Sequence, residues 1–126
     1  MLDQELIDRT LTSYCHRCDD GEFDALLELF TPGGELVLRG RTVRGHDELR
    51  TYFEETQGPL ERRGRHLTVN REIEVDADRA TAVSDFLFLR RINGQPVPAV
   101  VGRYHDILVR VDSGWLLARR EVRVWE

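Results

Sequence analysis

The amino-acid sequence predicts an α+β domain in which helices cover one face of a strongly curved sheet. Two observations predict this class. Apolar residues recur at intervals of three and four residues in the first half, as in a helix, and at intervals of two beyond Gly64, as in a strand. The extended segments are separated by very short turns, so consecutive strands are expected to pair as antiparallel hairpins.

The first helix is expected over residues 3–18. Ile7, Leu11 and Tyr14 follow the spacing that places apolar side chains on one buried face. Asp19-Asp20-Gly21 then interrupts the pattern, and Gly21 is suited to the left-handed conformation that commonly follows a helix. The chain is therefore expected to turn sharply at this point.

Two further helices are expected in the first half. A helical stripe covers residues 23–30, and another helix is expected over 45–57. Between them, Thr-Pro-Gly-Gly at 31–34 has the composition of a turn, and residues 35–39 have that of a short strand. The first half is thus predicted to be mostly helical.

Four longer strands are expected in the second half. The turns between them contain Asp-Ala-Asp, Asn-Gly and Asp-Ser-Gly, which are typical turn residues. A curved sheet that closes over helices leaves a tapered cavity between the two layers, and we expect a small-molecule site there. The expected strands are Arg65–Val75, Arg79–Ile92, Pro98–Val111 and Trp115–Trp125.

Composition narrows the possible functions. A chain of 126 residues, 40% of them hydrophobic, fits one domain spanning residues 1–126. The net charge of −5 argues against a nucleic-acid partner, because phosphate binding requires a positive surface. No apolar run approaches the roughly 20 residues of a membrane span, and the acidic N-terminus does not resemble a signal peptide. We therefore expect a cytoplasmic protein without a membrane partner.

All 18 basic residues are arginines, and two clusters of them stand out in the sequence. Arg62-Arg63-Arg65 and Arg119-Arg120-Arg123 could bind an anion, but we expect them on solvated loop and strand faces. The two cysteines, Cys15 and Cys18, are expected to pack late in the first helix, with redox or metal chemistry as the alternative. No metal-ligand spacing or phosphate-binding glycine motif is present, so no cofactor is expected.

Several local motifs occur in a characteristic order along the chain. With these motifs, the sequence resembles the SnoaL-like branch of the nuclear-transport-factor-2-like (NTF2-like) superfamily over nearly its whole length. The resemblance implies a cone of three N-terminal helices packed on a strongly curved antiparallel or mixed sheet. The motifs are Tyr14 to Asp19, Phe23-Asp24-Ala25-Leu26, Leu29-Phe30-Thr31, Arg65 to Asn70, Gly102 to Asp106, and Asp112-Ser113-Gly114-Trp115.

Within this superfamily, the sequence is most similar in its site pattern to scytalone dehydratase and bile-acid 7α-dehydratase. Those sites use an Asp near the end of the first helix and a His on the first long strand, which match Asp19 and His66. Tyr14 matches a third catalytic residue of the bile-acid enzyme. The resemblance implies that His66 is a base oriented by Asp19, and that Tyr14 is a hydrogen-bond donor.

Helix geometry complicates this assignment. Residues five apart on a helix are rotated by about 140° from one another, so Tyr14 and Asp19 cannot share one narrow face. Both would border one cavity only if the helix loosens near Cys18 or the cavity wraps around the helix end. The alternative is structural: Tyr14 in the core, Asp19 as a helix cap, and His66 as an ordinary strand histidine.

Aromatic residues are expected to line the cavity and to bind an apolar, ring-bearing or polyketide-like ligand. Strand parity and helix faces do not separate cavity residues from core residues. His16, His46 and His105 are expected at the surface or the sheet edge. The candidate substrate-binding residues are Phe53, Phe86, Phe88, Tyr104 and Trp115.

The leading hypothesis is a cofactor-independent lyase or isomerase that acts on a hydrophobic small molecule, in a homodimer or homotrimer. A ketosteroid-isomerase-like mechanism is disfavoured because Leu38 stands where its base would fall, and strand 84–91 lacks the second histidine of scytalone dehydratase. The alternatives are a non-catalytic binding module, an oxygenase β-subunit and a polyketide cyclase. An epoxide hydrolase is also possible if Asp85 or Asp106 faces Asp19.

Overall fold

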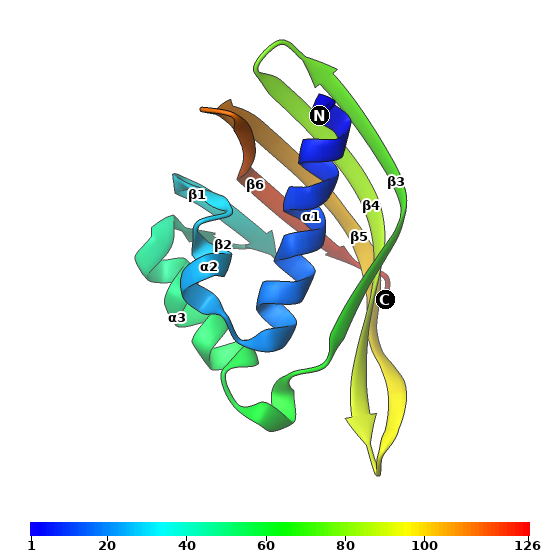
Figure 1. Cartoon of the computed structure of the whole chain (residues 1–126). Coiled ribbons are helices and arrows are strands. Elements are labelled where there is room, and N and C mark those ends of the chain that lie inside the picture. The colour runs from blue at the N-terminus through cyan, green and yellow to red at the C-terminus, as the bar shows by residue number, and fades with distance from the viewer.

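The computed structural model describes residues 1–126 as three helices packed on one face of a curved, six-stranded sheet (Figure 1). The strand order is β2-β1-β6-β5-β4-β3. Strands β1 and β6 pair in parallel and all other neighbours pair antiparallel, so the sheet is mixed. The elements are α1 (Asp3–Asp20), α2 (Phe23–Leu27), β1 (Phe30–Leu38), β2 (Arg41–Arg44), α3 (Gly45–Gln57), a 3-10 turn (Leu60–Arg62), β3 (Arg65–Asp76), β4 (Arg79–Ile92), β5 (Gln95–Val111) and β6 (Gly114–Val124).

The predicted α+β class, the first and third helices and the four long strands are confirmed. Gly21 follows α1 with φ of 71°. Its amide donates to the carbonyl of Cys18 and the Glu22 amide donates to the carbonyl of Arg17, as expected around a left-handed cap. Asn93 and Gly94 both have positive φ at the β4–β5 turn. This is the geometry of a tight hairpin of the Asn-Gly kind. The hairpin projects beyond the helical layer (Figure 1).

The segment around residue 30 differs from the prediction. Helix α2 ends at Leu27, and Phe30 begins β1 instead of continuing the helix. Residues 31–34, predicted as a turn, lie within β1, where the pairing with β6 shifts register between Phe30 and Glu35. The glycines and proline therefore form an irregular stretch of strand. Strand β2 was not predicted, because it is only four residues long and follows β1 after a two-residue turn.

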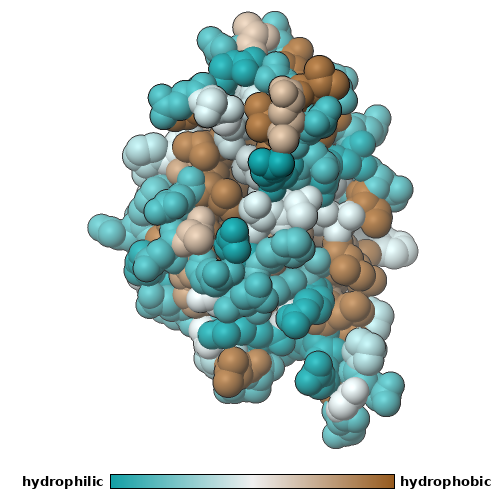
Figure 2. Space-filling model, in the orientation of Figure 1, coloured by the Kyte–Doolittle hydropathy of each residue, from teal (hydrophilic) through white to brown (hydrophobic).

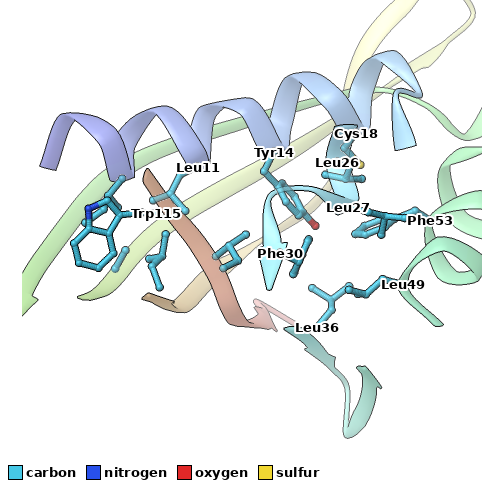
Figure 3. Close-up of a cluster of buried hydrophobic side chains, with 14 of the residues drawn as sticks. Leu11, Tyr14, Cys18, Leu26, Leu27, Phe30, Leu36, Leu49, Phe53 and Trp115 are labelled. Carbon is cyan, nitrogen blue, oxygen red and sulfur yellow. The ribbon is translucent and has the colours of Figure 1, made fainter. Parts of the chain in front are cut away.

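The core lies between the helices and the concave face of the sheet (Figure 3). Leu11 and Tyr14 point from α1 toward side chains of the sheet, while Trp115 lies under the first half of α1. The face of the molecule seen in Figure 2 is largely hydrophilic, with apolar side chains scattered over it. None of the helices has the length and apolarity that a membrane span requires.

Candidate active site

A cavity of about 270 Å³ opens between the helical layer and the sheet. Seventeen residues line it, twelve of them hydrophobic, and they come from α1, α3 and all the long strands. Tyr14 and Cys18, one helical turn apart on α1, form part of the wall, and His66 on β3 forms another part. The cavity is therefore mostly apolar, with a titratable ring in its wall, as is typical of small-molecule sites.

Asp19 and His66 form the most closely connected polar pair at this cavity. The His66 imidazole Nδ1 lies 2.6 Å from Asp19 Oδ1. The backbone N–H of His66 also donates to the same carboxylate, at 3.0 Å to Oδ2 and 3.2 Å to Oδ1. Both side chains are nearly buried, with 10% of His66 and 5% of Asp19 exposed. The carboxylate thus holds both the main chain and the ring of His66.

Helix α1 places Tyr14 and Asp19 on different sides of the His66 ring. Helix α1 continues without a break to Asp20, so Asp19 and Tyr14 do diverge around its axis. Tyr14 borders the cavity directly, whereas Asp19 does not form part of the cavity wall. Asp19 lies behind the imidazole of His66, a residue 47 positions later in the sequence. The helix does not need to loosen, because His66 itself connects the carboxylate to the cavity.

Tyr14 lies deep in the site and is 4% exposed. Its ring centroid is 6.4 Å from that of His66, in an edge-on arrangement. Figure 3 shows its hydroxyl directed toward the region of Phe53 and Leu36. Burial raises the pKa of the Tyr14 hydroxyl well above its usual value, so the group stays protonated at neutral pH. A protonated phenol at this position can donate a hydrogen bond to a ligand.

A buried ion pair supports the inner end of the site. Arg120 Nε and Nη2 donate to the two carboxylate oxygens of Asp106 at 2.8 and 2.9 Å, and both side chains are 0% exposed. The guanidinium lies over the rings of Tyr14 and Tyr104, at 4.3 and 3.7 Å from their centroids. Although burial disfavours its charge, the adjacent Asp106 raises the pKa of Arg120, so it remains a cation.

The expectation that Arg120 lies on a solvated strand face is therefore wrong. Simple alternation from the buried Leu117 would turn Arg119 inward and Arg120 outward. The register between β5 and β6 shifts between the pairs Ile107–Arg119 and Leu108–Leu117, which leaves Ala118 as an extra residue. This bulge reverses the parity and turns Arg120 into the core. Nothing in the sequence marks the bulge.

Four of the five predicted substrate-binding aromatics line the cavity, namely Phe53, Phe86, Phe88 and Tyr104. The centroid of the Phe88 ring lies 4.6 Å from that of the His66 ring. Phe86 stacks on Tyr104, with 4.4 Å between their ring centroids. Trp115 does not line the cavity. Its Nε1 donates to Asp3 at 3.2 Å near the opposite end of α1, so the structure places it in the core.

Other candidate residues do not join the site as catalytic groups. Asp106 turns inward but is bound to Arg120, and Asp85 is bound to Arg103 and Asn70 on the outer face. Neither lines the cavity, so the carboxylate pair of an epoxide hydrolase is not formed there. Cys15 and Cys18 are buried free thiols, and no group of three or more histidine, cysteine or carboxylate side chains is placed to bind a metal.

Comparison with known proteins agrees with this architecture. The family model for the SnoaL-like domain matches residues 1–121. The structure of Rv3472 from Mycobacterium tuberculosis, a protein of unknown function, is 28% identical, with 95% of this chain and 70% of that chain covered and a TM-score of 0.89. A protein from Novosphingobium aromaticivorans, provisionally named a scytalone dehydratase, is 25% identical, with coverage of 98% and 84% and a TM-score of 0.85.

A second protein from Novosphingobium aromaticivorans, described as NTF2-like with a cystatin-like fold, supports the fold assignment. It is 23% identical, with 98% of this chain and 82% of that chain covered and a TM-score of 0.88. No curated protein sequence matches the chain significantly. The family model covers nearly all of the sequence, and the fold that the resemblance implied is the one observed. The chain belongs to the SnoaL-like family.

Proposed function

We propose that the protein is a lyase or isomerase that removes a proton from the carbon beside a carbonyl group, using only its own side chains. The observation that carries this proposal is the 2.6 Å contact between Asp19 and His66 Nδ1, with the same imidazole forming part of the cavity wall. A carboxylate on Nδ1 favours the tautomer that carries its proton there. The other nitrogen, Nε2, is then free to accept a proton.

The proposed reaction proceeds in two steps. His66 Nε2 takes a proton from the α-carbon, and the C–H electron pair forms the double bond of an enol or enolate. Tyr14, protonated at neutral pH, donates a hydrogen bond to the carbonyl oxygen as it gains charge. In a dehydratase, the imidazolium then returns its proton to a β-hydroxyl, which leaves as water and restores neutral His66. In an isomerase, the same proton returns to a different carbon.

The cavity favours a compact substrate with one or two rings. Its volume of about 270 Å³ is near the lower end for small-molecule sites, and aromatic side chains form much of its wall. The relative provisionally named a scytalone dehydratase supports a dehydration reaction at 25% identity. A polyketide-like bicyclic hydroxyketone meets these requirements.

A fluorescence assay with 3-hydroxy-1-tetralone tests the proposal. Loss of water from this β-hydroxyketone yields 1-naphthol after tautomerisation, and 1-naphthol is fluorescent. We expect the wild-type protein to accelerate its formation, and we expect His66→Ala to abolish that acceleration while circular dichroism shows an intact fold. A His66→Ala variant with full activity would exclude the mechanism, and a ligand bound by the wild type without turnover would favour a binding module instead.

Gel filtration with light scattering separates a stand-alone enzyme from an oxygenase β-subunit. A stand-alone SnoaL-like enzyme is expected to form a stable homodimer or homotrimer when purified by itself. A β-subunit would need its large partner chain for a defined assembly. We expect the homo-oligomer.

A further inference from the structure

The residues that line the cavity carry an unbalanced positive charge. They include Arg39 and Arg90, and no Asp or Glu is among the seventeen. The chain as a whole has the opposite balance, with 23 acidic and 18 basic residues. The binding of a neutral hydrocarbon ring does not require guanidinium groups. The presence of two arginines therefore indicates that the ligand has a polar or negatively charged part.

Arg90 lies on the same face of β4 as Phe86 and Phe88, because side chains two residues apart on a strand share a face. Phe88 is directly opposite His66 in the β3–β4 register. Arg90 therefore stands two residues, or about 7 Å, further along the strand toward the projecting β4–β5 hairpin. An extended ligand whose reacting carbon faces His66 would reach Arg90 with its outer end.

Arg90 is also free of internal partners. Ten of the eighteen arginines form ion pairs with carboxylates, whereas Arg90 is exposed and forms none. Arg39 directly follows the last residue of β1, and its Nη2 lies 3.2 Å from Glu126 Oε1, but both side chains are more than 60% exposed. Such an exposed pair contributes little and is readily exchanged for a ligand. Both guanidinium groups are thus available at the cavity rim.

We infer that the substrate is an aromatic acid: a ring system that occupies the apolar cavity and carries a carboxylate at its outer end, bound by Arg90 with Arg39 nearby. A planar guanidinium donates two parallel hydrogen bonds to a carboxylate, which fixes the orientation of the ligand as well as its charge. The inference rests on the proposed function, because it names the substrate class for the same site. It assigns Arg90 to specificity and leaves proton transfer to His66.

Two probes of the same shape and different charge test this inference. Binding of 2-naphthoate and 2-naphthamide is measured by NMR titration at low ionic strength. We expect the wild type to bind the carboxylate at least tenfold more tightly than the amide. Arg90→Gln should remove most of this difference and leave the affinity for 2-naphthamide unchanged. Equal affinities of the wild type for both probes, or no binding of 2-naphthoate, would overturn the inference.

Arg91 offers a matched control, because it is exposed, lacks an ion pair and lies on the opposite face of β4 next in sequence to Arg90. Arg91→Gln should bind both probes like the wild type. If Arg91→Gln and Arg90→Gln weaken 2-naphthoate binding equally, the effect is one of general surface charge and the inference is wrong. A third probe, 2-naphthyl phosphate, tests whether the cavity rim prefers a carboxylate or a phosphate ester. If 2-naphthyl phosphate binds more tightly than 2-naphthoate, the rim is a phosphate-ester site and the inference of a carboxylate substrate is wrong.

Different results would overturn the carboxylate-binding role of Arg90 and the catalytic role of His66. His66→Ala should keep the preference for 2-naphthoate, because Arg90 and not His66 is assigned to the carboxylate. A lost preference in His66→Ala with wild-type behaviour of Arg90→Gln would place the anion at the imidazole and overturn the inference. Unchanged turnover in His66→Ala, with the preference for 2-naphthoate intact, would overturn only the catalytic role.

Discussion

The Asp19 carboxylate accepts hydrogen bonds from both the imidazole and the backbone amide of His66, and so joins the last turn of α1 to the start of β3. This double contact positions the ring at the cavity wall from behind. In the proposed mechanism, the same carboxylate stabilises the imidazolium that forms when His66 accepts a proton. Catalysis is therefore expected to depend on Asp19, although Asp19 does not line the cavity.

Asp19→Asn tests this positioning role. The substitution keeps the size of the side chain, but its amide group can donate to Nδ1 and favour the wrong tautomer of His66. We expect kcat for 1-naphthol formation to fall by about 100-fold or more, with a much smaller change in KM. Near-normal kcat in a folded Asp19→Asn protein would show that the carboxylate has only a structural role.

Tyr14→Phe removes the proposed donor without removing the ring. We expect kcat to fall by about 100-fold, the usual effect of deleting one donor to a developing oxyanion. Tyr52→Phe is the matched control, because Tyr52 also lines the cavity but comes from α3. Its kcat should stay close to that of the wild type. Equal losses in the two variants would assign the effect to cavity polarity and not to Tyr14.

Asp106→Asn should destabilise the protein strongly, because it leaves the fully buried Arg120 cation without its charge partner. Breaking a buried ion pair from one side costs about 3–5 kcal/mol, which urea unfolding can measure. The double variant Asp106→Leu with Arg120→Met should recover part of this loss, since no buried charge remains. Asp85→Asn, in the exposed pair with Arg103, should have a much smaller effect. A similar effect of Asp85→Asn and Asp106→Asn would contradict the assigned role of burial.

The two buried cysteines are expected to lower the free energy of unfolding of the protein at alkaline pH. Burial raises the pKa of the Cys15 and Cys18 thiols, so the folded chain keeps both protonated. The unfolded chain loses these protons above about pH 8.5. It then binds fewer protons than the folded chain, and the free energy of unfolding falls as pH rises from about 8.5 to 10.

Urea unfolding at pH 7, 8.5 and 10 measures this slope. We expect the fall between pH 8.5 and 10 to be smaller in a Cys15→Ala, Cys18→Ala variant, whatever its stability at pH 7. An identical slope in the variant and the wild type would show that the thiols do not contribute.

The sequence predicted the fold well where periodicity and turn residues agree. Gly21 and Asn93-Gly94 mark the end of α1 and the β4–β5 turn, and the structure places both as expected. The secondary structure of residues 23–34 was harder to predict. The glycine- and proline-rich start of β1, where the pairing with β6 is irregular, has the composition of a turn. Strand β2 is too short to produce a periodic signal.

The site was predicted in part for similar reasons. The resemblance singled out Tyr14, Asp19 and His66, and the structure brings Asp19 to His66 and Tyr14 to the same cavity. Arg120 could not be assigned, because one extra residue in β6 reverses the alternation. Trp115 was wrongly grouped with the cavity aromatics, since alternation along a strand gives the face of the sheet but not the position along it.

Hydrogen exchange at carbon measures proton removal by His66 separately from the departure of any leaving group. The α-hydrogens of 2-tetralone are followed by NMR in D₂O with saturating protein. We expect exchange with the wild type to be at least 100-fold faster than with His66→Ala, which should match buffer alone. Exchange in His66→Ala at the wild-type rate, or no acceleration by the wild type, would contradict the proposed role of His66.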